Sequence, residues 1–297
     1  MTFLTYLING ISLGSVYAII ALGYTMVYGI AKMLNFAHGD VIMVGGYISY
    51  FAANSFGLPP IVSVLAASLV CTCLGIVIER LAYKPLRSSA SLAVLITAIG
   101  VSYFLQNGAM LVWSSNPRVY ASLVGFKGFS MFGGRLNVSG EAVVTVLACI
   151  VIMAGLTYLT QKTKLGKAMR ACSEDKAAAQ LMGINVDSTI SATFAIGSAL
   201  AAVAGVLLCS SYSTLMPTTG SMPGIKAFTA AVFGGIGSIP GAVIGAFLIG
   251  ICETIIKGLP SSWNVSVFSD AFTFALLIVI LTCKPTGLFG EKATDKV

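Results

Sequence analysis

Residues 1–31 decide the fold class: they read MTFLTYLINGISLGSVYAIIALGYTMVYGIA and contain no Asp, Glu, Lys or Arg. A helix of about 20 apolar residues is long enough to cross the hydrocarbon core of a bilayer. The stretch lacks a basic start, and its apolar run is longer than that of a secretory signal peptide. It therefore predicts a membrane-spanning helix.

Further charge-free stretches follow along the chain, at 41–78, 88–117, 142–161, 188–225 and 227–252. Each can hold one span and the long ones two, and none shows the polar–apolar alternation of barrel strands. We predict an all-α polytopic membrane protein with about eight to nine transmembrane helices, some of them broken or re-entrant. The expected spans are 3–29, 41–56, 60–82, 90–113, 141–161, 189–211, a broken 225–257, and 266–283.

The composition excludes several classes of protein. Only 9% of the 297 residues are charged and the mean hydropathy is +0.94, whereas soluble domains have about 25% charged residues. The net charge of +7 is not gathered into a basic patch with aromatic residues, as in nucleic-acid-binding surfaces. A soluble domain, a disordered chain and a nucleic-acid binder are therefore excluded.

The distribution of basic residues predicts the orientation of the chain. Of the 17 Lys and Arg residues, 12 fall near 32, 80–87, 162–187 and the C-terminus. Lys and Arg accumulate in cytoplasmic loops, so these parts are expected in the cytoplasm and the N-terminus outside. The opposite side keeps Arg118, Lys127, Arg135, Lys226 and Lys257.

The last long apolar segment is interrupted at 234–241, which reads GGIGSIPG. Proline removes a backbone donor and clustered glycines favour bending, so we expect two packed helices around a turn. Gly237, Gly241 and Gly245 stand four residues apart, a spacing that lets another helix approach closely. The alternative is a loose kink without function.

The most informative polar stretch, 163–187, reads TKLGKAMRACSEDKAAAQLMGINVD. Ser173 is a good N-cap and Gly183 a good residue to follow the end of a helix, which predicts a helix over 174–182. A helix of about nine residues is marginal alone in water. It is therefore expected to need a docking surface, the alternative being a solvated loop helix.

Few side chains could carry chemistry. His38, the only histidine, lies beside Asn35 and Asp40, and it is either a polar element of a permeation path or a residue that caps backbone groups. With one histidine and dispersed cysteines, no metal site is expected. The acids Glu253 and Asp270 are expected near span ends, where they take part in docking or the path, or simply reach water.

Four motifs, in order along the chain, resemble the permeases of branched-chain amino acid ABC importers. Residues 166–185 match G-x-A-x-R-A-x-x-E-D-x-x-A-A-x-L-M-G-I-N, the cytoplasmic coupling segment of that family. LNFAHGD at 34–40, GIGSIPGA at 235–242 and KPTGLFG at 284–290 are similar to its other motifs. Lys284 stands where the family more often has Arg.

The resemblance implies an ABC importer permease fold, with one transmembrane permease domain over 1–297 and a coupling segment at 163–187 in a bacterial inner membrane. The N-terminus would be periplasmic and the C-terminus cytoplasmic. The residues implied in coupling to an ATPase are Gly166, Ala168, Arg170, Ala171, Glu174, Asp175, Ala178, Ala179, Leu181 and Gly183. Because transporters often place sites at interrupted helices, the residues expected on the translocation path are Asn35, His38, Gly39, Asp40, Gly235, Gly237, Pro240 and Gly241.

The resemblance also implies partners: a second, homologous permease, two cytoplasmic ATPase subunits that carry ATP and Mg, and a periplasmic solute-binding protein. The chain has no G-x-x-x-x-G-K-[ST] motif for binding ATP itself, so neither catalysis nor a cofactor is expected on it. Rival interpretations are a related permease for urea, short amides or other amino acids, an ion-coupled secondary carrier or channel, and an intramembrane enzyme. The carrier would need ionisable groups deep in the spans, and the enzyme a partner for His38.

Overall fold

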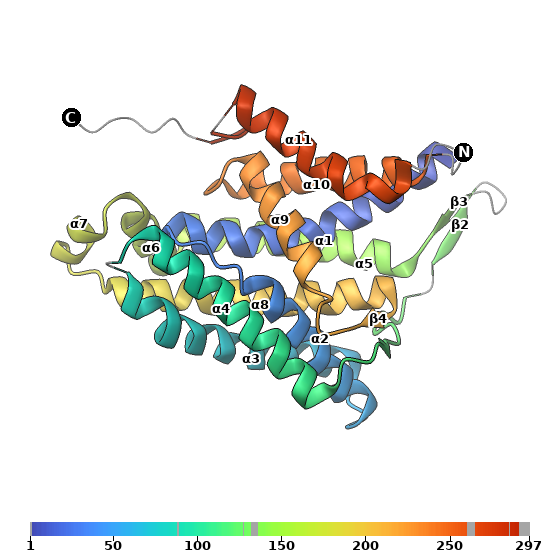
Figure 1. Ribbon diagram of the computed structural model, residues 1–297, viewed down its shortest axis with the longest axis horizontal. Helices are drawn as coiled ribbons and strands as arrows, with labels where there is room; N and C mark the ends of the chain where they lie inside the picture. Colours follow the sequence, from blue (N-terminus) through green and yellow to red (C-terminus); the bar gives the residue numbers. More distant parts are fainter. Residues whose placement is uncertain are drawn as a thin grey trace.

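The computed structural model describes residues 2–87, 89–126, 128–131, 136–259, 265–284 and 286–290. Helices dominate it (Figure 1). The helices are α1 Thr2–Ala31, α2 His38–Asn54, α3 Pro60–Ile78, α4 Ser91–Trp113, α5 Gly140–Lys162, α6 Lys164–Glu174, α7 Lys176–Leu181, α8 Val186–Tyr212, α9 Ser221–Gly234, α10 Ile239–Lys257 and α11 Ser269–Cys283.

Short elements complete the described fold. A π-helical turn, η1 Glu79–Tyr83, and a 3₁₀ turn, η2 Lys84–Leu86, extend α3. A second 3₁₀ turn, η4 Val265–Phe268, precedes α11. Two small antiparallel ladders join β1 Arg118–Val119 to β4 Thr214–Leu215, and β2 Phe129–Met131 to β3 Leu136–Val138.

The helices confirm an all-α membrane protein with broken segments. Within the described residues, six helices are long and apolar enough to cross a membrane. The helices α2, α9 and α11 also fall in predicted spans, but they are shorter, with 17, 14 and 15 residues. A 14-residue helix rises only about 21 Å, less than the ~30 Å of a hydrocarbon core. By itself, α9 therefore covers only part of the membrane thickness.

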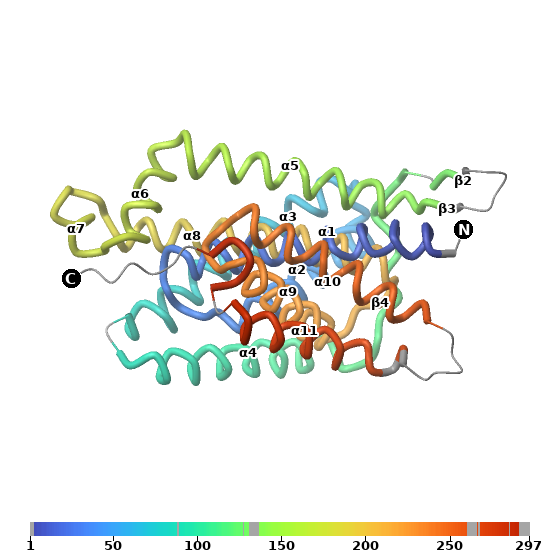
Figure 2. The backbone as a smooth tube through the Cα atoms, turned by 90° about the horizontal axis from the view of Figure 1, so that it is seen from above, coloured from blue at the N-terminus to red at the C-terminus, as the bar shows by residue number. Residues whose placement is uncertain are grey.

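The two ends of the helix bundle are formed by different elements. The helices α6 and α7 lie at one end, together with the turns that follow α1 and α3, whereas the start of α1 and the β2–β3 ladder lie at the other (Figures 1 and 2). The basic loops near 32, 80–87 and 163–187 thus share one end of the bundle. Lys127, Arg135 and residues 291–297, on which the predicted orientation also rests, lie outside the described residues.

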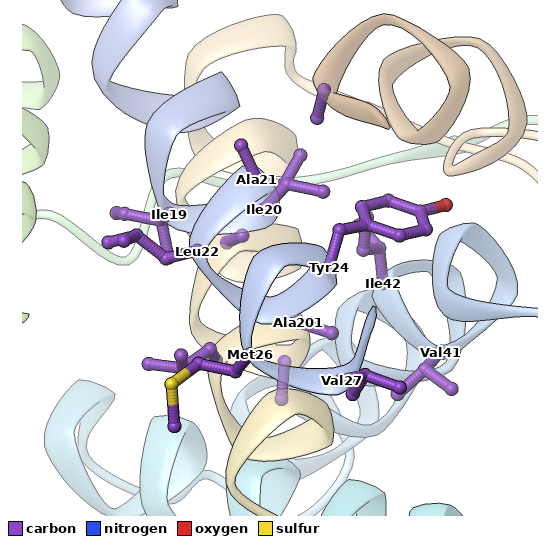
Figure 3. Packing of buried hydrophobic residues seen from close by; sticks show 14 of the residues in the cluster. Ile19, Ile20, Ala21, Leu22, Tyr24, Met26, Val27, Val41, Ile42 and Ala201 are labelled. Carbon is purple, nitrogen blue, oxygen red and sulfur yellow. The ribbon is translucent and has the colours of Figure 1, made fainter. Parts of the chain in front are cut away.

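The centre of the core is formed by α1, α2 and α8 (Figure 3). In α1, Ile19, Ile20, Ala21 and Leu22 are all fully buried. Small residues bring α2 and α8 together, since a Cβ on Gly205 would lie 2.3 Å from the carbonyl oxygen of Ile42. Such close approach increases van der Waals contact between membrane helices.

The predicted break in 225–257 is confirmed, with α9 and α10 as its two helices. A Cβ on Gly241 would lie 2.4 Å from the Gly234 oxygen, and one on Gly245 would lie 2.3 Å from the Ala230 oxygen. These two glycines allow the expected close packing. The expectation for Gly237 is wrong: a Cβ there meets nothing within 4 Å. Its backbone has φ +100°, so glycine is needed for the turn itself.

Candidate functional site

The helix α6 folds back along the end of α5. Thr163 caps it, its hydroxyl accepting a hydrogen bond from the Gly166 amide at 3.0 Å. A Cβ on Gly166 would lie 2.1 Å from the Leu159 carbonyl oxygen. Met169 and Cys172 are buried on the same face. Gly166 therefore shapes the segment from inside rather than offering a surface.

The predicted helix over 174–182 is wrong at its start. α6 continues to Glu174, and Asp175 separates it from α7. The Asp175 carboxylate accepts from the amides of Ala177 at 2.8 Å and Ala178 at 3.0 Å. Ser173, the expected cap, donates instead to the Arg170 carbonyl oxygen at 2.7 Å. Asp175 caps α7 because its backbone is extended and its carboxylate reaches two free amides at once.

The end of α7 agrees with the prediction. Gly183 has φ +83°, and its amide donates to the Gln180 oxygen at 3.0 Å. The next amide, that of Ile184, donates to the Ala179 oxygen at 3.0 Å. No atom lies within 4 Å of a Cβ placed on Gly183. The residue is thus required for the left-handed backbone and not for space.

A groove of about 570 Å³ runs between α6 and α7. Six predicted coupling residues line it: Ala168, Ala171, Glu174, Asp175, Ala178 and Ala179. The sequence prediction did not include four other lining residues, Lys164, Lys167, Met182 and Ile184. Its lining combines four alanines with basic and acidic groups, which makes it suited to a protruding protein element.

The other predicted coupling residues lie outside this groove. Leu181 is 89% exposed next to it. Arg170 is exposed, and its guanidinium donates to the Gln161 carbonyl oxygen at 3.4 Å. Gly166 is buried and Gly183 lies in the exit turn. The segment therefore combines a lined groove with residues that set its shape.

A lysine outside the prediction connects α7 to the membrane helices. The Lys176 ammonium donates to the Ala31 carbonyl oxygen at the end of α1, at 2.8 Å. Burial, and then the positive charges of Arg87 and Lys32, lower the pKa of Lys176. A cation at a helix C-terminus is favoured by the helix dipole. Nothing local in the sequence indicates this contact, because the two residues are 145 positions apart.

After α1, the chain turns back before α2 begins at His38. The Tyr83 hydroxyl donates to Asn35 Oδ1 at 2.9 Å. The His38 ring is 1% exposed, lies 4.5 Å from the Tyr24 ring centre, and occupies the notch left by Gly23. Asn35 and His38 are thus buried by contacts with distant helices.

The start of α2 meets the start of α9. Gly39 touches Gly220, and a Cβ on Gly220 would lie 1.7 Å from the Gly39 oxygen. Beside this contact, the Gln106 amide of α4 donates to Asp40 Oδ1 at 2.9 Å and to the Ser221 hydroxyl at 3.3 Å. The prediction included Gly39 and Asp40 but not Gly220, Ser221 or Gln106. Clustered Pro and Gly over 217–224 was the signal for this second interruption.

The break at 235–238 lies against residues 288–290 instead. The amides of Leu288 and Phe289 donate to the carbonyl oxygens of Phe233 and Gly234, at 2.9 and 3.0 Å. A Cβ on Gly235 would lie 2.4 Å from the Gly290 nitrogen. Pro240 stands in the first turn of α10. A place for Gly235, Gly237, Pro240 and Gly241 on the translocation path stays a prediction.

The sequence of this chain is similar to that of known proteins. Residues 6–281 match the family model described as branched-chain amino acid transport system, permease component. The chain belongs to this permease family. The match extends over nearly all the helices described above, from α1 into α11.

Curated relatives are similar to this permease over almost its full length. The high-affinity branched-chain amino acid transport system permease proteins LivH of Escherichia coli K12 and Salmonella typhimurium are 44% and 43% identical to it, covering 99% of this chain and 98% of theirs. BraD of Pseudomonas aeruginosa is 43% identical with the same coverage. PsaBC from Streptococcus pneumoniae, solved in complex with Fab, shares the fold at a TM-score of 0.50 and 12% identity, covering 96% of this chain and 91% of that one.

This member of the permease family also holds an ion network near the start of α9 and the end of α10. Glu253 accepts from Lys226 and Lys257, both at 2.6 Å, and from the Tyr17 hydroxyl at 2.9 Å. Lys226 also contacts Asp270 at 2.6 Å. Glu253 and Lys257 stand four residues apart on α10, on successive turns of the helix. The expectation that Glu253 reaches water is wrong, because the residue is 0% exposed and surrounded by its partners.

Proposed function

We propose that this chain is the membrane-spanning subunit of an ATP-driven importer for branched-chain amino acids, located in a bacterial inner membrane. The observation that carries the proposal is its 43–44% identity, over 99% of the chain, to permease proteins named for that transport. The solute would pass from a periplasmic binding protein to the cytoplasm. Two such chains, or this chain and a homologue, would enclose the path.

The α6–α7 groove is the proposed docking surface for an ATPase subunit. It lies at the end of the bundle that carries the basic loops, the end we assign to the cytoplasm. The periplasmic end is then the one with the start of α1 and the β2–β3 ladder. ATP and Mg would be bound by two partner ATPases, since this sequence has no P-loop motif.

Coupling would run through Lys176. When the ATPases close, they would push on α6 and α7, and the 2.8 Å bond from Lys176 to the Ala31 oxygen would carry the movement to the end of α1. The segment 32–37 follows directly and leads to the junction of α2 with α9. A change at the cytoplasmic groove can thus reach the membrane interior through contiguous contacts.

Transport by reconstituted vesicles tests this function. Purified permease, its genomic partner permease, two ATPases and the binding protein would be assembled, with ATP on the ATPase side. We expect uptake of labelled leucine, isoleucine or valine that requires ATP and loaded binding protein. Uptake of these solutes driven by an ion gradient, without the ATPases, would contradict the proposal.

A further inference from the structure

The described part of the chain has three buried acidic side chains, and one of them differs from the other two. Glu79 pairs with Arg87, and Glu253 pairs with Lys226 and Lys257. Asp40, which is 2% exposed, forms no ion pair among the described residues. Burying an unpaired carboxylate inside a membrane costs free energy, and a cation that pairs with it removes part of this cost. A buried carboxylate without such a partner therefore marks a functional site.

The surroundings of Asp40 leave one oxygen open. Its Oδ1 accepts from the Gln106 amide at 2.9 Å, whereas the buried Oδ2 has no hydrogen-bond partner. The Ser102 hydroxyl and the backbone amide of Asp40 also lie against this carboxyl group. A carboxylate can accept several hydrogen bonds. The cluster therefore holds the side chain by one oxygen and leaves the other for an additional donor.

The cluster also borders the surface of the chain. Gln106 and Ser221, which share a hydrogen bond of 3.3 Å, are both half-buried. On the same turn of α9, Met222 and Ile225 are 45% and 42% exposed. An apolar face of α9 thus leads to a fixed carboxylate. A solute with an aliphatic chain and a positive group matches both features.

We propose that Asp40, positioned by Gln106, binds the α-ammonium group of the transported amino acid as it passes between the starts of α2 and α9. This proposal rests on the proposed function. An ammonium group supplies both the missing donor for Oδ2 and the missing charge, which a carboxylate or a neutral hydroxyl cannot do. In this structure Gly39 and Gly220 are in contact, so the two helix starts must separate for the solute to reach Asp40.

Asp40→Asn tests the charge alone, because asparagine keeps an oxygen that can accept from Gln106. In reconstituted vesicles we expect the number of leucine molecules imported per ATP hydrolysed to fall at least about tenfold, since a hydrogen bond to a charged group is lost. ATPase stimulation by loaded binding protein should persist. Asp40→Glu should restore part of the import, and the matched control Glu141→Gln, in the first turn of α5, should behave as wild type.

Binding to the wild-type complex provides a second measurement that does not depend on how well a variant folds. Labelled leucine would be bound to the detergent-solubilised complex without binding protein, and competed with 3-methylbutylamine or 4-methylpentanoate. The amine keeps only the ammonium group of leucine and the acid only its carboxylate. We expect the amine to compete and the acid to fail. Equal competition, stronger competition by the acid, or no bound leucine at saturation would overturn the proposal.

The two proposals fail in different ways. If the wild-type assembly imports no branched-chain amino acid, the proposed function is wrong. If the wild type imports leucine and Asp40→Asn imports it at the same yield per ATP, only the role of Asp40 is wrong. Asp40 would then serve as a neutral hydrogen-bond acceptor for Gln106, a role that asparagine fills.

Discussion

The α6–α7 segment and the junction of α2 with α9 are stabilised in opposite ways. In the segment, the capping bonds of Thr163 and Asp175 span two or three residues. At the junction, Gln106 joins side chains that lie 66 and 115 positions away along the chain. Local bonds are set by neighbouring residues, whereas the junction exists only when the whole bundle packs. The two regions should therefore respond differently to substitution.

The largest loss of stability is expected at the buried ion network of Glu253, where long-range contacts surround charged groups. Glu253→Leu leaves Lys226 buried with only Asp270 beside it, and breaking a buried pair costs about 3–5 kcal/mol. The thermal unfolding midpoint of the purified complex should fall strongly. In the matched double variant, Lys226→Met with Glu253→Leu, part of the loss should return because no buried charge remains. Additive losses in the double variant would show that the pair is not coupled.

A smaller but still large effect is expected from one methyl group at the junction. Gly220→Ala places a Cβ 1.7 Å from the Gly39 oxygen, so α2 and α9 must move apart. Overpacking costs about 1–3 kcal/mol, and import should fall with stability. The control is Gly155→Ala in α5, where a Cβ meets nothing within 4 Å. If both variants unfold at the same temperature, the close contact of α2 with α9 is absent in the working protein.

This difference also explains what the sequence could predict. Charge-free stretches locate the long helices because a bilayer fixes their length, and Gly183 marks the end of α7 through its own backbone. Ser173 was a poor choice of cap because Asp175, two residues on, competes for the same helix start. The contacts of Asp40 with Gln106 and of Lys176 with Ala31 leave no local pattern. Six of the ten residues that line the groove follow from a motif, whereas the junction depends on tertiary packing.

In the α6–α7 segment, the backbone at Gly183 should matter more than any contact. Gly183→Val forces a β-branched residue into φ +83°, which costs on the order of 1–2 kcal/mol. We expect normal membrane insertion, a redirected exit from α7, and loss of import. Gly183→Asn is the control, because asparagine tolerates left-handed backbone better. Equal import by the two variants would mean that the turn after α7 does not orient the groove.

The smallest change in stability, with a large change in function, is expected at the rim of the groove. Glu174 is exposed, lines the groove and has no ion pair among the described residues, so Glu174→Arg should alter stability by about 0.5 kcal/mol or less. Reversing a charge on a docking surface nevertheless opposes a complementary partner. Import and ATPase stimulation should both fall while the unfolding midpoint stays unchanged. The control is Lys162→Glu, which reverses the charge of an exposed residue outside the groove. If Glu174→Arg couples ATP hydrolysis to import as well as wild type, with the ATPases still attached, the groove is not their docking surface. The helices α6 and α7 would then serve only to connect α5 to α8.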